Sequence, residues 1–243
     1  MVAPFIMKHL DLRFGPGSRL AFGEDGNLVA EFNWRVQYDV CPTWLTLAID
    51  HAKRATEHRI RRIEAWAGTS DELKAQTLLD EFQSSLQAVV AAATALEATY
   101  SAVLPLVQIP VMTRQSWQKN RTPRYAQVAE VLRRGFSLGN KHTKGIHANV
   151  REIYRLRDSA VHPTAELRPL VWHSEMKVPV EWQFDTYRAR NTELIVAGVG
   201  QLLWQLSHHA SIRNPRVQAF AVNMKLYLAE LFPDGCPALP TAE

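Results

Sequence analysis

The chain has 243 residues, of which 47% are hydrophobic and 21% charged, an ordinary composition for a globular protein with a buried core. Two cysteines, Cys41 and Cys236, are too few for a disulfide framework or a cysteine zinc site, and they fit a reducing cytoplasm. The first residues lack a long apolar core, so we expect no signal peptide. The most apolar run, 86–107, is interrupted by Glu97 and is expected to be a buried helix and not a membrane span.

In the first half of the chain, residues 1–40 are predicted to form a small β element, because short alternating runs are separated by glycine-containing turns. A helix is expected from about residue 42 to residue 68. Its predicted apolar stripe is Leu45, Ile49, Ala52, Ile60 and Ile63, and its predicted outer face is Lys53, Arg54, Arg61 and Arg62.

The strongest pattern lies between residues 70 and 104. Ser70 and Asp71 are suited to capping a helix, and apolar residues then recur at alternating spacings of three and four. This period of about 3.5 predicts one helix of roughly 30 residues that lies along another helix at a shallow angle. Pro105 and Pro110 are expected to end it.

The second half is expected to contain a basic linker over 113–124 and helices near 125–134, 146–161, 189–211 and 215–232. The alternation within 169–187 is compatible with a β-hairpin. The prediction is a mainly α fold: a helical bundle over 41–232 with one long helix, the β element of 1–40 packed on it, and a tail from 233 to 243. A helix-turn-helix over 124–161 is not expected, because about ten residues separate its two predicted helices where roughly three or four are required.

Basic residues are concentrated in the middle of the chain. Residues 113–157 contain eleven lysines and arginines and two acids, a net charge of +9, so the rest must carry −5 to give the total of +4. A basic centre in an otherwise acidic protein favours a polyanionic partner. Solvated helix faces that are balanced by acids from elsewhere are the alternative, and charge alone does not choose between them.

The helix predicted for 146–161 ends on the sequence RDSAVH, from Arg157 to His162. Arg157 falls on the apolar stripe of this helix, so it should have an anionic partner or open onto a solvated cleft or a subunit interface. His162 precedes a proline, which should end the helix there. Taken singly, the two residues are more simply read as a buried ion pair and a helix-end histidine.

Together, RDSAVH resembles the signature of HEPN domains (higher eukaryotes and prokaryotes nucleotide-binding), a family of α-helical bundles. Many members are metal-independent endoribonucleases in which the arginine and histidine of two chains form one composite site. The resemblance implies a catalytic role for Arg157, for His162 and for Asp158 as the polar residue of the motif. It covers the motif and, more loosely, residues 70–211.

The chemistry of RNA cleavage agrees with these residue types. The 2′-hydroxyl can attack the adjacent phosphate without a metal if a base that works near neutral pH, such as histidine, is present. A guanidinium can stabilise the charge that develops on the phosphorus oxygens. The sequence contains no credible set of metal ligands, and we expect no cofactor. The predicted RNA-binding residues are Lys141, Lys144, His147 and Arg151.

The leading interpretation is therefore a cytoplasmic endoribonuclease of the HEPN type, a toxin or defence factor that acts as a homodimer and has an antitoxin partner. The first alternative is a HEPN-like protein without nuclease activity that binds nucleotides or a partner protein. The second is a nucleic-acid-binding module that uses the basic segment 113–157. No membrane partner is expected.

Overall fold

The computed structural model describes residues 8, 10–23, 25–162 and 167–240, without the side chains of residues 11, 13 and 140–143. The fold is mainly α, as predicted. The helices are α1 (Cys41–Trp66), α2 (Asp71–Val103), the 3-10 turn η1 (Leu104–Leu106), α3 (Val111–Lys119), α4 (Arg124–Gly135), α5 (Asn140–Val161), α6 (Trp182–Thr186), α7 (Ala189–Ser207) and α8 (Pro215–Leu231). The strands are β1 (Leu10–Phe14), β2 (Arg19–Phe22), β3 (Leu28–Glu31), β4 (Trp34–Tyr38), β5 (Val171–Trp172) and β6 (Pro179–Val180).

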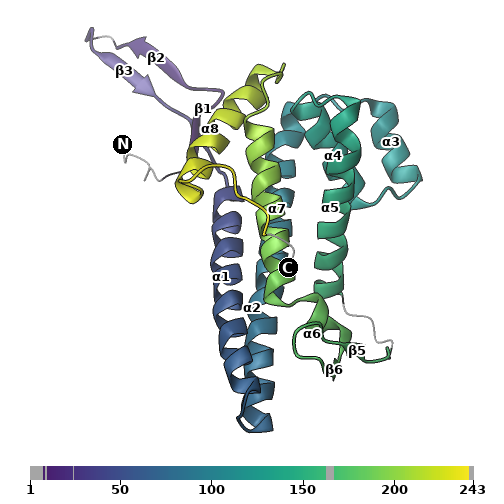
Figure 1. The fold of residues 1–243 in the computed structure, drawn as a ribbon. Coiled ribbons are helices and arrows are strands. Elements are labelled where there is room, and N and C mark those ends of the chain that lie inside the picture. Colours follow the sequence, from purple (N-terminus) through teal and green to yellow (C-terminus); the bar gives the residue numbers. More distant parts are fainter. Residues whose placement is uncertain (1–7, 9, 24, 163–166, 241–243) are drawn as a thin grey trace.

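The long helix α2 organises the bundle, and its predicted extent is confirmed. The Ser70 side chain accepts a hydrogen bond from the backbone N–H of Leu73, which caps the first turn. Pro105 lies in η1, directly after the helix. α2 packs along α1 over most of its length and also contacts α4, α5 and α7 (Figure 1). The candidate motif helix, α5, is thus held against the centre of the bundle.

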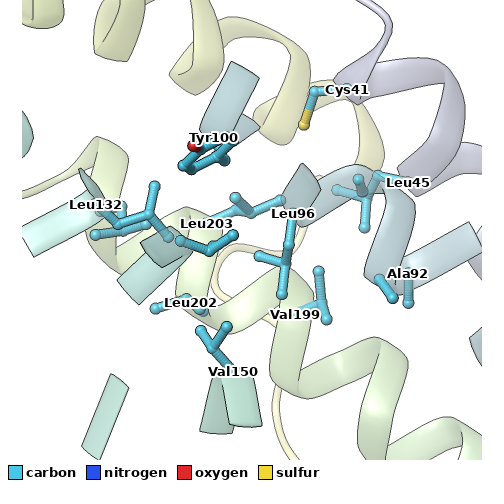
Figure 2. Close-up of a cluster of buried hydrophobic side chains, with 14 of the residues drawn as sticks. Cys41, Leu45, Ala92, Leu96, Tyr100, Leu132, Val150, Val199, Leu202 and Leu203 are labelled. Carbon is cyan, nitrogen blue, oxygen red and sulfur yellow. The ribbon is translucent and has the colours of Figure 1, made fainter. Parts of the chain in front are cut away.

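The core lies where α1, α2, α4, α5 and α7 meet (Figure 2). Leu45 of α1, Leu96 of α2 and Leu203 of α7 are completely buried there, and Leu132 and Val150 bring in α4 and α5. Where α7 meets the C-terminal segment, Gly200 allows close contact, since a Cβ atom there would lie 2.8 Å from the ring of Phe232. Gln201 also donates a hydrogen bond to the carbonyl of Pro237, so this part of the tail packs on α7.

Among the described residues, one helical stretch, Asp71–Leu106, is long and apolar enough to cross a membrane, with a hydropathy of 1.5 in its most apolar window. Half of that window is buried inside the protein. A core helix of a soluble protein meets the same two criteria, so length and composition do not distinguish the two cases.

The predicted stripe of α1 is wrong in its second half. Ile60 and Ile63 are 52% and 46% exposed, whereas Arg62, which was predicted to lie on the outer face, is 1% exposed. The buried positions beside it are Ala55 and Ala65, whose small side chains leave room between α1 and α2. Arg62 is buried because it has acidic partners, and such partners cannot be found from the spacing of apolar residues.

The acidic partners of Arg62 connect the 169–187 segment to the helical bundle. Arg62 donates from Nε to the buried carboxylate of Glu81 and from Nη2 to Glu175, the latter at 2.5 Å. Glu81 also accepts the backbone N–H of Ala189 at 2.9 Å, at the first residue of α7. Glu175 lies in the turn between β5 and β6, a strand pair of two residues each, so the predicted hairpin is present but short. One ion-pair cluster therefore joins α1, α2, α7 and this turn.

Two other boundaries differ from the predictions. The basic linker contains α3, and α5 begins at Asn140, earlier than predicted, so only residues 136–139 separate α4 from α5. The length objection to a helix-turn-helix is therefore wrong. The first turns of α5, NKHTKG, contain no apolar residue, and apolar periodicity could not detect them.

The N-terminal strands form two ladders, β1 with β4 and β2 with β3. The β2–β3 ribbon projects away from the helices (Figure 1), and the side chains of Leu20, Phe22 and Leu28 are 60%, 77% and 58% exposed. At the base of the β element, the Tyr38 hydroxyl lies 2.9 Å from the Thr43 hydroxyl of α1, and Lys8 forms an ion pair with Glu230 of α8.

Candidate nuclease motif and basic face of α5

The RDSAVH motif occupies the last turns of α5. The helix ends at Val161, and the backbone N–H of His162 donates to the carbonyl of Asp158 at 2.8 Å. The side chain of His162 is exposed, as is that of Asp158. The prediction that the helix ends at His162 is confirmed, and the imidazole is accessible to a ligand at the C-terminal end of α5.

Arg157 is half-buried, with 30% of its side chain exposed. Its Nε atom lies 2.8 Å from Oδ1 of Asp158, yet that contact lacks hydrogen-bond geometry, and the buried Nε–H finds no acceptor among the described residues. Adjacent residues on a helix do not face each other, which explains the poor alignment. The guanidinium also lies over the ring of Tyr154, 4.8 Å from its centre. Asp158 is thus an anionic neighbour of Arg157, but it does not satisfy the Nε–H donor of Arg157.

The carboxylate of Glu97, on α2, connects this helix to α4 and α5. It accepts a hydrogen bond from the Tyr154 hydroxyl at 2.5 Å and one from Nε of Arg124 at 2.8 Å. Burial alone would raise the pKa of Glu97, but these hydrogen bonds and the charges of Arg124 and Arg157 hold it below its usual value. The pKa of Tyr154 is raised well above its usual range, mainly because the hydroxyl is buried and secondly because it donates a hydrogen bond to Glu97. Glu97 is therefore ionised and fixes the ring on which Arg157 lies.

The exposed face of α5 carries a row of side chains at spacings of three and four, all of them polar except Ala148. Every residue in this row is exposed: Lys144, Ala148, Arg151, Arg155, Asp158 and His162. Side chains with this spacing lie one above another along a helix. From Lys144 to His162 the row spans about 27 Å, at 1.5 Å per residue. We call it the α5 basic row; it begins at lysine and ends at the motif histidine.

The predicted RNA-binding residues do not all lie on this row. Lys144 and Arg151 do, and both are exposed. His147 is half-buried, and its ring meets that of Tyr125 edge-on at 5.2 Å, so it packs inside the protein more than it faces solvent. The side chain of Lys141 lies outside the described part of the chain. Arg155 was not predicted, although its position four residues after Arg151 would have placed it on the row.

Ion pairs account for about half of the basic charge of 113–157. Glu130 pairs with Arg133 and Arg134, Glu97 with Arg124, and Asp158 with Arg157. Arg155 pairs with Glu152 on the exposed surface. In the described part of the chain, the basic residues of this segment without an ion pair are Arg114, Lys119, Arg121, Lys144 and Arg151. Uncompensated positive charge therefore remains at two places, on α5 and around α3.

Within one chain, Arg157 and His162 emerge on different sides of α5. Five helical residues correspond to a rotation of about 140°, and His162 has already left the helix, with φ −123° and ψ 68°. A ligand that meets both groups must therefore reach around the helix end or receive one of them from a second chain. Among the described residues, no group of three or more histidine, cysteine, aspartate or glutamate side chains is placed to hold a metal ion.

Comparisons of the chain with known proteins found no relative. No protein-family model, no curated protein and no solved structure matches the chain.

Proposed function

We propose that this protein is a metal-independent endoribonuclease in which His162 and Arg157 act on the RNA backbone. The observation that carries the proposal is the α5 basic row, because its exposed cations lead along one helix face to an accessible histidine. Two of these cations, Lys144 and Arg151, form no ion pair in the described part of the chain, and Arg155 is paired with Glu152. The guanidinium of Arg157, whose side chain is 30% exposed, lies in the same last turns. The resemblance of RDSAVH to the HEPN signature adds the assignment of roles.

In the proposed reaction, the 2′-oxygen forms a bond to phosphorus and the bond from phosphorus to the 5′-oxygen breaks. One histidine takes the proton of the 2′-hydroxyl, and a protonated histidine gives a proton to the departing 5′-oxygen. Arg157 exchanges its poorly aligned contact with Asp158 for the phosphate oxygens, where its planar fork stabilises the developing negative charge. The Tyr154 ring, fixed by Glu97, holds the guanidinium from behind.

A homodimer would supply the second histidine. The different directions of Arg157 and His162 support this arrangement, since two chains related by a two-fold axis could place both pairs of side chains at one phosphate. Figure 1 shows β5 and α6 at the same end of the molecule as the C-terminus of α5. Exposed apolar side chains occur in this part of the chain, with Val161 49% exposed and both Leu170 and Trp172 64% exposed, and a dimer interface would cover them.

The decisive experiment is cleavage of single-stranded RNA by the purified protein in the presence of a chelator of divalent metals. We expect cleavage to continue, because no step above uses a metal, and we expect products with 2′,3′-cyclic phosphate ends. The ends are identified by their resistance to labelling until a phosphatase that opens cyclic phosphates is added. A folded dimer that cuts no RNA at any salt concentration would eliminate the nuclease proposal, and 3′-hydroxyl ends would eliminate this mechanism.

RNA binding without cleavage is the second candidate, and the same α5 basic row favours it. Replacing Lys144 and Arg151 with alanine should weaken binding to single-stranded RNA and flatten its dependence on salt. Each lost phosphate contact is expected to lower the slope of log K against log salt by about 0.7, or about 1.4 for both. The slope is measured by fluorescence anisotropy at several salt concentrations.

The control for this measurement is the double replacement of Lys53 and Arg54 with alanine. Both side chains are exposed on α1, so the change in net charge is the same while the α5 basic row stays intact. Equal slopes for the two double variants would show that the α5 basic row is an ordinary solvated surface.

A further inference from the structure

A second cationic site lies around α3, and none of its lining residues belongs to the α5 basic row. It is an open pocket of about 490 Å³ between the C-terminal end of α2, α3 and the beginning of α4. Its lining includes Tyr100, Arg114, Trp117, Gln118, Arg121 and Gln127. The volume falls within the range of about 300–1,000 Å³ that small-molecule sites occupy.

The charge in this pocket is positive and unpaired. Arg114 and Arg121 are exposed and form no ion pair in the described part of the chain. None of the described residues that line the pocket is acidic, and the segment from Val111 to Arg121 contains no acidic residue. Two guanidinium groups that form no ion pair in the described part of the chain are suited to an anion, and their planar forks match the oxygens of a phosphate.

The backbone beside the pocket is held in a costly conformation. Arg121 has φ +47°, in the left-handed region that a residue with a Cβ atom rarely adopts. The turn is fixed on both sides of it, because Thr122 N–H donates to the carbonyl of Trp117 at 2.9 Å and Arg121 N–H donates to that of Gln118 at 3.3 Å. This turn sets Arg121 next to α3, where its side chain lines the same pocket as Arg114.

Of the two aromatic residues in the lining, Trp117 is more exposed than Tyr100. Tyr100 is 4% exposed, and Arg124 covers its ring at 4.0 Å from the centre. Trp117 is half-buried and packs against the core, so its position is fixed while part of its surface faces the pocket. Indole offers a flat apolar surface on which a nucleobase can stack.

From these contacts we infer that the pocket binds a nucleoside phosphate, with its phosphate on Arg114 and Arg121 and its base against Trp117. Two cations alone would suit any anion; the fixed indole in the same pocket is what selects a ligand with an aromatic base. The site goes beyond the proposed nuclease function, since none of its lining residues belongs to the RDSAVH motif, and it requires no cleavage of RNA.

Binding is measured with AMP carrying an N-methylanthraniloyl group on its ribose, followed by fluorescence, with unlabelled AMP, adenosine and inorganic phosphate as competitors. AMP should compete better than either adenosine or phosphate, because only AMP uses both halves of the pocket. Arg114→Ala should weaken binding about 10- to 100-fold, the usual loss for a hydrogen-bonded charge. Arg121→Asn should act similarly, since asparagine tolerates the left-handed backbone while the charge is removed.

Lys119→Ala is the matched control. It removes a positive charge from the last turn of α3, but Lys119 does not line the pocket, so binding should change by no more than about two-fold at moderate salt. Arg157→Ala and His162→Ala should bind the labelled AMP like the parent chain, which separates this site from the nuclease motif.

Three results would overturn the inference: no binding of labelled AMP by the folded parent chain, equal losses for Lys119→Ala and Arg114→Ala, or inorganic phosphate competing as well as AMP. Because Arg114 and Lys119 are both exposed, neither substitution depends on repacking of the core. If the pocket binds AMP and the protein cuts no RNA, the nuclease proposal fails alone.

Discussion

His162→Ala is expected to lower the rate of RNA cleavage by about 10²- to 10⁴-fold, the usual contribution of a general acid or base. The side chain is exposed at the end of α5, so the thermal unfolding of the variant should match that of the parent. The rate is measured on a short labelled RNA with enzyme in excess, so that binding does not limit it.

His208→Ala is the control for this variant. His208 is also an exposed histidine directly after a helix, α7, but it belongs to no basic row and stacks on Trp204. Its removal should leave cleavage unchanged. If both histidine variants cut as fast as the parent, the motif has no catalytic role, and RNA binding without cleavage becomes the better account.

Substitutions of Arg157 test the proposed stabilisation of the phosphate oxygens in the same reaction. Arg157→Ala should lose about 10²- to 10³-fold in rate through the missing stabilisation of the phosphate oxygens. Arg157→Lys should not restore the parent rate, because lysine keeps the charge and loses the planar fork. Full recovery with lysine would show that only charge is needed at this position.

The largest effect on stability is expected at Glu81. Glu81→Ala leaves Arg62 buried with Glu175 as its remaining carboxylate and removes the acceptor of the Ala189 N–H. Breaking a buried pair from one side costs about 3–5 kcal/mol. For a chain of this size, that corresponds to a fall in Tm of about 6–20 °C, measured by circular dichroism or calorimetry.

Glu152→Ala provides the matched control, since it breaks an ion pair with Arg155 in which both side chains are more than half exposed. That pair should contribute no more than about 1 kcal/mol. Replacing Arg62 and Glu81 together with methionine should recover part of the lost stability, because Glu175 keeps its ion pair with Arg59 and no buried charge is left unpaired. The Ala189 N–H still lacks its acceptor in this variant, so recovery should not be complete. A Glu81→Ala chain as stable as the Glu152→Ala chain would show that the Arg62–Glu81 pair does not hold the bundle together.

Local patterns predicted the helices well where apolar residues recur. The Ser70 cap, the period of 3.5 and Pro105 together define α2, since each acts within a few residues of the chain. The sequence of α3 predicts a linker, because its nine residues show no apolar stripe; Val111 and Met112, its first two residues, are both exposed. The first turns of α5 were missed for a similar reason.

The candidate site was predicted in its residues but not in its surroundings. RDSAVH is contiguous, so Arg157 and His162 could be named from the sequence. The partners that hold the site are distant: Glu97 is 57 residues from Tyr154, and Arg62 is 113 residues from Glu175. Pairings over such separations depend on how the helices pack, which a single sequence does not specify.

The two cysteines differ in a way that is useful in practice. Cys41 is completely buried, with its sulfur 3.1 Å from the Thr99 hydroxyl and 3.2 Å from that of Tyr227, and burial raises its pKa to about 12. Cys236 is exposed, in the segment that packs on α7. A maleimide dye therefore attaches to the folded chain at one defined position without any engineered cysteine. Two such chains, one with a donor dye and one with an acceptor, would report subunit association by energy transfer in the unmodified sequence.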